Sequence, residues 1–262
     1  MSVFGHLVVG TDGSDSAWRA VEHAVRLGGA LDAGVVVTNA YPPPGSPRAD
    51  RVDVYPGPEV GASILRDVAE SFEDAAELRC ELRAGDPVDV LIEVALEASA
   101  DAIVVGNRGM GRRRTLLGAV PSKVAHRAPC SVLIAHTTGA APPPPYRRVL
   151  IGTDGSPTAT RAVEVGGALA AGVGADILLA RAGDDGAEGI LRDAAGRLPA
   201  SAATRAVEGE PAAALTGLAR AEGCDLIVVG NKGMTGARRF LSSVPSRVAH
   251  HAGCHVLLVK TT

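Results

Sequence analysis

The chain has 262 residues, of which 46 % are hydrophobic and 3 % aromatic, so that Val, Leu, Ala and Ile have to fill its core. Its formal net charge of −3 argues against the overall positive field that attracts nucleic acid or an anionic membrane surface. No apolar run approaches the roughly 20 residues of a membrane-spanning helix, and the first residues lack a signal-peptide pattern, so we expect a cytoplasmic protein.

The first half of the chain alternates apolar strand segments with amphipathic helix segments. The predicted order is strand Leu7–Val9, helix Ser16–Gly28, strand Val35–Asn39, helix Ile64–Glu77, a short strand Cys80–Arg83, helix Pro87–Ala98, strand Ala102–Val105, helix Val120–Arg127 and strand Val132–Ala135. Strands that are apolar on both faces and alternate with helices are typical of a parallel sheet with helices on both sides. We therefore predict an α/β fold with a doubly wound sheet of five parallel strands.

The second half of the chain repeats the first. LVVGTDGSDSAWRAVEHA at 7–24 returns as VLIGTDGSPTATRAVEVG at 149–166, and DAIVVGNRGM at 101–110 returns as DLIVVGNKGM at 225–234. A repeat of this length is a domain rather than a solenoid unit. The sequence therefore predicts two tandem copies of the same five-stranded domain.

Two proline-rich segments divide the chain. Residues 41–60 are largely an insertion of the first copy without clear periodicity, so we expect a loop there. TGAAPPPPY at 138–146 predicts a polyproline spacer that holds the copies near each other without merging them. We place the first domain at 1–138, the linker at 139–145 and the second domain at 146–262.

The cysteines and two repeated histidines have no spacing typical of a metal site or a redox pair. The four cysteines are Cys80, Cys130, Cys224 and Cys254. We expect them to be buried small hydrophobic residues in a reducing compartment rather than redox groups. His126 and His250 each stand alone in their copy, which favours helix packing or surface exposure over metal binding.

The loop after the first strand reads GTDGSDS and returns as GTDGSPT. In doubly wound sheets, ligands bind outside the carboxyl ends of the strands, where the strand order reverses. Ser14 or Asp15 can cap the next helix, with Gly13 in the turn. Capping does not require Asp12 and Asp154, whose carboxylates can accept hydrogen bonds from ribose hydroxyls or hold Mg²⁺ beside phosphate. Both interpretations stay open for this loop.

The loop after the fourth strand carries a glycine pair in each copy, Gly106 with Gly109 and Gly230 with Gly233. Glycines let backbone N–H groups approach an anion, and the N-terminus of the next helix favours the same anion. The helix starts add further groups to this phosphate cradle, namely Val120, Ser122, Val244 and Ser246.

Basic side chains lie within and after these glycine pairs. Arg108 and Lys232, inside the pairs, are the phosphate candidates. The arginines at 112–114 and 238–239 fit phosphate contacts or solvated charges equally well.

With these motifs both halves resemble the universal stress protein family in its tandem two-domain form. That family's ATP-binding pattern is G-x2-G-x9-G-(S/T). The first glycine pair is followed by eight residues and then by Gly118 and Ala119, and the second by eight residues and then by Ser242 and Ser243. Both arms are one residue short, copy 1 lacks the hydroxyl, and copy 2 lacks the glycine.

The resemblance implies ribose contacts from the first loop, and backbone contacts to adenine from the end of the second strand. In copy 1 the implied nucleotide-binding residues are Gly10, Thr11, Asp12, Gly13, Ser14, Ala40, Gly106, Arg108, Gly109, Gly118, Ala119, Val120 and Ser122. In copy 2 they are Thr153, Asp154, Ser156, Ala182, Gly230, Lys232, Gly233, Ser242, Ser243, Val244 and Ser246. No catalytic or protein-bound metal residue is assigned. The expected ligand is ATP, with or without Mg²⁺, while AMP and a cyclic nucleotide fit the same motifs.

Three functions are compatible with this pattern. The first is a stress-response regulator whose nucleotide occupancy alters its shape or its choice of protein partner. The second is an interaction module of the same fold that has lost its ligand. The third is an ATP-hydrolysing enzyme, for which we find no nucleophile–base pair and no SGGxDS loop, so at most slow hydrolysis is expected.

The resemblance also implies how the copies assemble. The final strands, SVLIAH at 131–136 and HVLLVK at 255–260, are expected to pair antiparallel and so form an intrachain pseudo-dimer. Two such chains can associate further as a homodimer. We further expect copy 1 to bind nucleotide more tightly than copy 2, and a Gly106→Asp or Gly230→Asp change to abolish binding while folding survives.

Overall fold

The computed structural model describes residues 3–46, 57–107, 117–137, 144–183, 186–231 and 243–261. The first copy contains β1 (His6–Gly10), α1 (Asp15–Leu31), β2 (Gly34–Tyr41), α2 (Pro58–Ser71), β3 (Leu78–Ala84), α3 (Pro87–Glu97), β4 (Ala102–Gly106), α4 (Ala119–Arg127) and β5 (Ser131–Ala135). The second copy contains β6 (Arg148–Gly152), α5 (Pro157–Val173), β7 (Asp176–Ala182), α6 (Ala187–Ala195), β8 (Ala202–Val207), α7 (Pro211–Ala221), β9 (Leu226–Asn231), α9 (Val244–His251) and β10 (His255–Lys260). The alternation of five strands with helices in each copy is confirmed. No helix within these described ranges is both long and apolar enough to cross a membrane.

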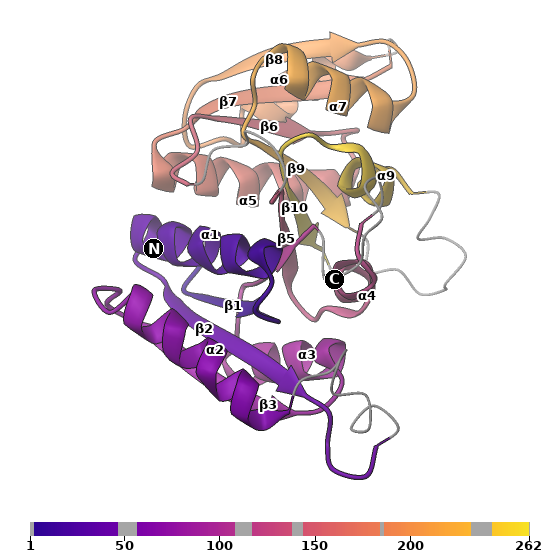
Figure 1. Ribbon diagram of the computed structural model, residues 1–262. Coiled ribbons are helices and arrows are strands. Elements are labelled where there is room, and N and C mark those ends of the chain that lie inside the picture. Colours follow the sequence, from indigo (N-terminus) through magenta and orange to yellow (C-terminus); the bar gives the residue numbers. More distant parts are fainter. Residues whose placement is uncertain are drawn as a thin grey trace.

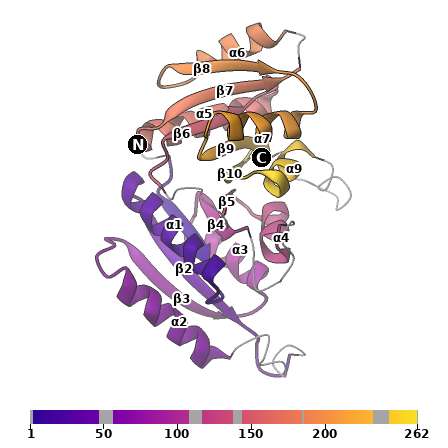
Figure 2. The same ribbon diagram turned by 45° about the horizontal axis from the view of Figure 1, so that its top comes forward.

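All ten strands belong to one sheet, in the order β3-β2-β1-β4-β5-β10-β9-β6-β7-β8 (Figures 1 and 2). Within each copy the strands are parallel, and the copies are joined where β5 pairs antiparallel with β10. Leu133 lies opposite Leu257 in that pair, and both are fully buried. The expected antiparallel pairing of the final strands is therefore confirmed.

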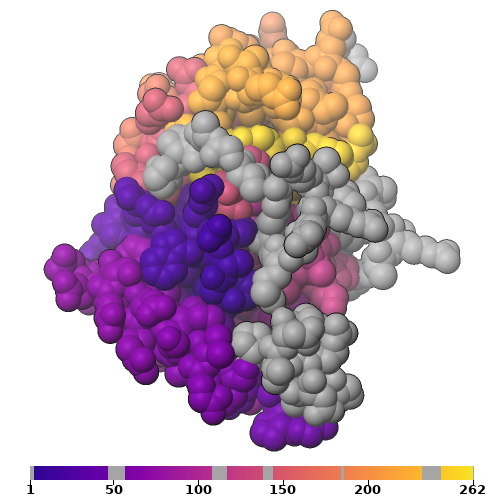
Figure 3. Space-filling view, viewed as in Figure 1, coloured from indigo at the N-terminus to yellow at the C-terminus, as the bar shows by residue number. Residues whose placement is uncertain are grey.

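Helices cover both faces of the sheet, and the core on each face runs through both copies. One layer packs under α1, α2, α5 and α6, and the other under α3, α4, α7 and α9. The helices α1 and α5 lie side by side across the middle (Figures 1 and 2), where a Cβ atom on Gly172 would come within 2.8 Å of Leu31. In Figure 3 the surface of the first copy, indigo to magenta, abuts that of the second, orange to yellow. The expectation that the copies stay unmerged is wrong, because two apolar edge strands are buried by pairing with each other.

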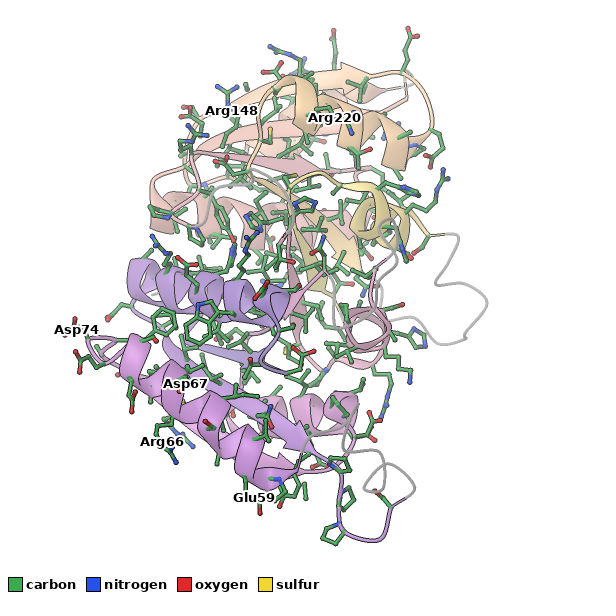
Figure 4. All side chains as sticks on the ribbon, in the orientation of Figure 1. Glu59, Arg66, Asp67, Asp74, Arg148 and Arg220 are labelled. Atoms are coloured by element: carbon green, nitrogen blue, oxygen red, sulfur yellow. The ribbon has the colours of Figure 1, made fainter. Side chains whose placement is uncertain are left out.

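Helix α2 lies earlier in the chain than predicted. It spans Pro58–Ser71 instead of Ile64–Glu77, so the end of the segment expected to be a loop is helical. Proline is well accommodated in a first helical turn, and Gly57 precedes it as the N-cap residue. The helix ends at Phe72, whose ring packs 5.9 Å from that of Trp18 on α1. Figure 4 shows charged side chains on the outer side of this helix, among them Glu59, Arg66 and Asp67.

The cysteines differ in burial, which corrects part of the prediction. Cys224 and Cys254 are buried and Cys130 is half-buried, but Cys80 is exposed. Cys80 lies in β3, which is the terminal strand of the sheet formed by the described residues. Edge strands keep one side open to solvent, and the run of charged neighbours along β3 fits that position.

Candidate functional site

The strands that precede the predicted loops of each copy are neighbours at the point where the strand order reverses. In copy 1, β1 pairs with β2 on one side and with β4 on the other. In copy 2, β6 pairs in the same way with β7 and β9. The loops that follow β1 and β4 therefore leave from neighbouring strand ends, as do those after β6 and β9. Doubly wound sheets generally bind ligands in the crevice at such a reversal, and we refer to this location as the crevice of each copy.

The loop after β1 is a tight turn held to the end of β2. The Thr11 N–H donates to the Thr38 carbonyl (2.9 Å), and the Asn39 side-chain amide donates to the Thr11 carbonyl (2.8 Å). Gly13 has a φ of 77°, a left-handed conformation that favours glycine. A Cβ atom there would also lie 2.7 Å from the side chain of Ile64 on α2. Glycine is therefore favoured at this turn by its conformation, and a larger residue would also require the Ile64 side chain to shift.

Ser14 is the N-cap residue of α1, and its side chain accepts from the Ala17 N–H at 3.3 Å. This settles which residue caps the helix. The half-buried Asp12 uses its Oδ1 atom to accept from the N–H (3.0 Å) and the hydroxyl (2.6 Å) of Ser14. Its Oδ2 atom has no hydrogen bond to the described residues. The turn thus fixes the Asp12 carboxylate at the strand end and leaves one oxygen available to a ligand.

The corresponding loop of copy 2 has the same turn but a different neighbour. Gly155 has a φ of 79°, and Ser156 caps α5 while its N–H donates to Asp154 Oδ1 at 2.9 Å. Asp154 is exposed. Arg181 stands where copy 1 has Asn39, and its guanidinium donates to the Asp154 carbonyl at 3.3 Å. The two sites therefore differ in burial and in local charge.

The segment after β4 is anchored by Asn107, a residue that the sequence analysis did not select. Its Oδ1 atom accepts from the N–H (3.1 Å) and the hydroxyl (2.7 Å) of Thr137, and its carbonyl accepts from the Gly118 N–H (3.0 Å). The Thr137 hydroxyl also lies 2.6 Å from that of Ser16 on α1. Asn107 thereby ties together the start of α4, the end of β5 and the first loop. The repetition of Asn107 as Asn231 and of Thr137 as Thr261 is the sequence signal that could have identified them.

The helix starts are capped differently in the two copies. Gly118 is the N-cap residue of α4 and offers no side chain, whereas Ser243 caps α9 and accepts from the Ser246 N–H at 3.4 Å. Ser246 is fully buried, and its hydroxyl has no hydrogen-bond partner among the described residues. Ser122, its counterpart in α4, is half-buried. Among the described residues, the N–H groups of Ala119 and Val120 in α4 and of Val244 in α9 have no hydrogen-bond partner, and copy 2 adds the hydroxyl of Ser246.

The glycine of the family pattern, present in copy 1 as Gly118 and replaced in copy 2 by Ser242, does not account for unequal binding by the copies. Gly118 has a φ of −59°, a conformation open to any residue. No left-handed backbone is needed at this position of copy 1, so the pattern's glycine does not by itself make a serine costly there.

Gly106 and Gly230 have a structural role beyond the one predicted. Both lie within strands, Gly106 at the end of β4 and Gly230 inside β9. A Cβ atom on Gly230 would lie 2.5 Å from the carbonyl oxygen of Thr158 in the first turn of α5. We therefore expect an aspartate at Gly230 to destabilise the fold as well as to oppose a phosphate, because Gly230 lies within β9 and packs against helix backbone.

The remaining predicted residues fall into two groups. Ala40 in β2 and Ala182 at the end of β7 are half-buried at the carboxyl edge of the sheet, beside the first loops. The others lie outside the described residues, namely Arg108, Gly109, Lys232, Gly233, Ser242 and the arginines at 112–114 and 238–239.

His250 lies at the contact between the copies. Its Nδ1 atom accepts from the N–H of Leu117 in copy 1 at 3.4 Å, and burial followed by the neighbouring His251 lowers its pKa. This is a packing role, as predicted for this histidine.

Known proteins resemble both copies. The sequence pattern of the universal stress protein family matches residues 4–136, 145–206 and 192–260. Universal stress protein Rv1636 of Mycobacterium tuberculosis is 42 % identical over 147 residues, which cover 53 % of this chain and all of that protein. Universal stress protein Rv2005c of the same organism is 31 % identical over 192 residues, covering 68 % of this chain and 64 % of that one.

Among solved structures, a universal stress protein from Archaeoglobus fulgidus superimposes with a TM-score of 0.81 at 21 % identity and covers 98 % of this chain and 99 % of that chain. This likeness supports the fold of the whole tandem chain. A universal stress protein solved in complex with cAMP is 36 % identical and covers 52 % of this chain and all of that one, with a TM-score of 0.43.

Proposed function

The chain belongs to the universal stress protein family, and on that premise we propose that it binds ATP or a related adenine nucleotide in the crevice of each copy. The proposed binding domains are residues 1–138 and 146–262, joined by a linker at 139–145. Nucleotide occupancy would make the protein a cytoplasmic stress-response regulator that acts on protein partners, alone or as a homodimer.

One observation carries the proposal. In both copies the strand that leads into the aspartate turn pairs with the strand that precedes a helix start, at the point where the strand order reverses. A carboxylate accepts hydrogen bonds from paired hydroxyls, whereas the unpaired N–H groups of a helix start favour an anion. A nucleotide joins a ribose diol to phosphates and so matches both groups at once.

Polar groups at both crevices fit such a ligand. In copy 1, Asp12 Oδ2 is the acceptor for ribose, and the N–H groups of Ala119 and Val120 face the phosphates. In copy 2, Asp154 takes the ribose role, while the buried Ser246 hydroxyl is a donor that a phosphate oxygen would satisfy. A buried hydroxyl without a partner costs free energy, so a ligand that pairs with it gains affinity. Mg²⁺ accompanying ATP would be held by phosphate oxygens and by Asp12 or Asp154.

The test combines ligand identification with a matched pair of variants. Freshly purified full-length protein is denatured and any released nucleotide identified, and binding of ATP, AMP and cyclic AMP is measured by calorimetry. Asp12→Asn retains an Oδ1 acceptor for Ser14 but loses the charge that strengthens a ribose contact. We expect it to weaken binding to copy 1 about tenfold, the equivalent of about 1.4 kcal/mol.

Asp15→Asn is the control, because it makes the same charge change on the exposed first turn of α1. It should leave affinity unchanged within about twofold, since exposed charges contribute little. An unaltered affinity in Asp12→Asn would remove the ribose assignment. Absence of binding by every nucleotide would favour the alternative, a protein-interaction module of the same fold.

A further inference from the structure

A buried cluster of titratable side chains lies between the two copies. His23 comes from α1 of copy 1, whereas Tyr146 and His255 come from copy 2, just before β6 and at the start of β10. All three are at most 3 % exposed. His23 Nε2 lies 2.7 Å from the Tyr146 hydroxyl, and the two imidazole rings are 4.3 Å apart between centroids. The cluster is therefore part of the contact that holds the copies together.

The repeat provides an internal comparison for this cluster. Aligning the copies places Val165 opposite His23, Phe4 opposite Tyr146, and Ser131 opposite His255. Val165 and Phe4 belong to the same core layer, and Ser131 is buried. The repeat thus defines two equivalent sets of positions at the interface. One set carries three titratable groups, and the other carries none.

His255 also makes a hydrogen bond that depends on its protonation state. Its Nδ1 atom accepts from the backbone N–H of His136 at 3.0 Å, and its counterpart Ser131 accepts from the N–H of Lys260 at 3.2 Å. These two bonds link the ends of the antiparallel β5–β10 pair. A protonated imidazole has no lone pair on Nδ1, so protonation removes the acceptor and leaves two N–H groups facing each other.

We propose that the His23–His255 pair is a proton-sensitive contact that weakens the interface between the copies when the protein is acidified. Two buried rings this close cannot both carry a positive charge without strong repulsion, and burial removes the water that would solvate one. The neutral pair is compatible with the closed interface, and the protonated pair favours its opening.

The electrostatic surroundings agree with this proposal. Burial, followed by the neighbouring His255, lowers the pKa of His23 well below its usual value. Burial, followed by Asp225, raises the pKa of Tyr146, so the phenol stays neutral. Below about pH 6.5 the open state therefore binds more protons than the closed one, and the interface loses stability as the pH falls through that range.

Next to the cluster, His136 is half-buried and donates its backbone N–H to His255, the buried Asp225 accepts from the N–H of Arg147 at 2.6 Å, and Lys260 donates to the Ala128 carbonyl at 3.1 Å. On α5, Arg161 and Glu164 form an ion pair at 3.5 Å. On α1 itself, Glu22 pairs with Arg26 at 2.8 Å, and Arg19 donates to the Thr137 carbonyl at 2.8 Å. His6 at the start of β1 is exposed, and β4 and β5 contribute uncharged side chains.

The contact continues into the crevice of copy 1. His136, which donates to His255, precedes Thr137, whose N–H and hydroxyl bond to Asn107. The same hydroxyl lies 2.6 Å from that of Ser16 beside the first loop. An extension of the proposal rests on the proposed nucleotide binding: acidification lowers the nucleotide affinity of the copy 1 site through this chain of hydrogen bonds.

Hydrogen exchange of the full-length protein without nucleotide tests the interface. Amide exchange is followed by mass spectrometry on peptides from β5 and β10 at pH 7.5 and pH 5.5, and corrected for intrinsic rates. Each histidine that becomes protonated when the interface opens should raise the equilibrium constant for opening about tenfold at pH 5.5. The reason is that the pKa of a histidine in the open state, about 6.5, lies about one unit above that pH. Peptides from the outer strands β3 and β8 serve as the reference.

The variants replace each residue of the cluster with the residue at the equivalent position of the repeat. The double variant His23→Val with Tyr146→Phe recreates the Val165 and Phe4 positions, and His255→Ser recreates Ser131. Both should flatten the pH dependence of β5 and β10, whereas His6→Gln, which removes an exposed histidine, should retain it. An equal pH dependence in wild type and both variants would overturn the proposal, as would a wild type without any. If the double variant does not fold, His255→Ser alone decides between these outcomes.

Calorimetry with ATP at both pH values tests the extension separately. We expect the copy 1 affinity of the wild type to fall severalfold more at pH 5.5 than that of His255→Ser. An equal fall in both removes the extension and leaves the interface result intact. Absence of ATP binding at pH 7.5 refutes the nucleotide function instead, since the exchange experiment contains no nucleotide.

Discussion

The Gly230→Ala substitution tests whether the repeated glycine after the fourth strand serves packing or ligand approach. The added Cβ would lie 2.5 Å from the Thr158 carbonyl oxygen and 2.9 Å from the carbonyl carbon. Both atoms belong to backbone in the first turn of α5, so they cannot rotate away as a flexible side chain does. Inserting one methyl group into a well-packed site costs about 1–3 kcal/mol, and this geometry points to the upper end.

The net effect includes an opposing term. Alanine loses less conformational entropy on folding than glycine, which offsets about 0.5–1 kcal/mol inside a strand. We therefore expect Gly230→Ala to lower the free energy of unfolding by about 2 kcal/mol. The assay is equilibrium urea unfolding of the full chain at pH 7.5, with ATP binding measured in parallel.

The control is Gly217→Ala, an exposed helical position in α7 where an added Cβ meets no atom within 4 Å. It should raise the free energy of unfolding by about 0.5–1 kcal/mol, because alanine is the better helix former. If Gly230→Ala unfolds at the wild-type urea concentration but loses ATP binding to copy 2, the packing argument is refuted. The glycine would then serve the close approach of phosphate, as the sequence pattern alone suggests.

Two further predictions concern the crevices and the thiols. Copy 1 should bind nucleotide more tightly, because Asp12 is half-buried whereas Asp154 is exposed and its carboxylate is better screened by solvent. In titrations of the full-length protein, Asp12→Asn should remove the tighter binding step and Asp154→Asn the weaker one. The reverse assignment would contradict this order. A thiol reagent at pH 8 should label the exposed Cys80 first, because burial raises the pKa of Cys130 and Cys224 to about 11 and that of Cys254 to about 12. If the Cys80→Ser variant still contains a rapidly labelled thiol, the structure around one of the other three cysteines must open.

Much of this molecule follows from local patterns in the sequence. Apolar runs of strand length and helical periodicity identify five strands in each copy, and the repeat makes every assignment twice. The carboxyl-end location of the site follows from the alternation of strands and helices, because such chains form parallel sheets whose loops meet at one edge. The turn at Gly13 and the cap at Ser14 are likewise local, since their partners lie within a few residues.

Tertiary structure alone decided what lies between the copies. The two sheets join where the apolar strands β5 and β10 pair, an arrangement that the family resemblance implied but that periodicity within one strand cannot reveal. Gly230 has a packing role because α5 crosses β9 closely, although the local sequence pattern predicts that this glycine belongs to a phosphate-binding loop. His23 and Tyr146 are 123 residues apart in the chain yet share a hydrogen bond. Burial of such groups depends on which faces meet, and no local pattern of residues encodes that geometry.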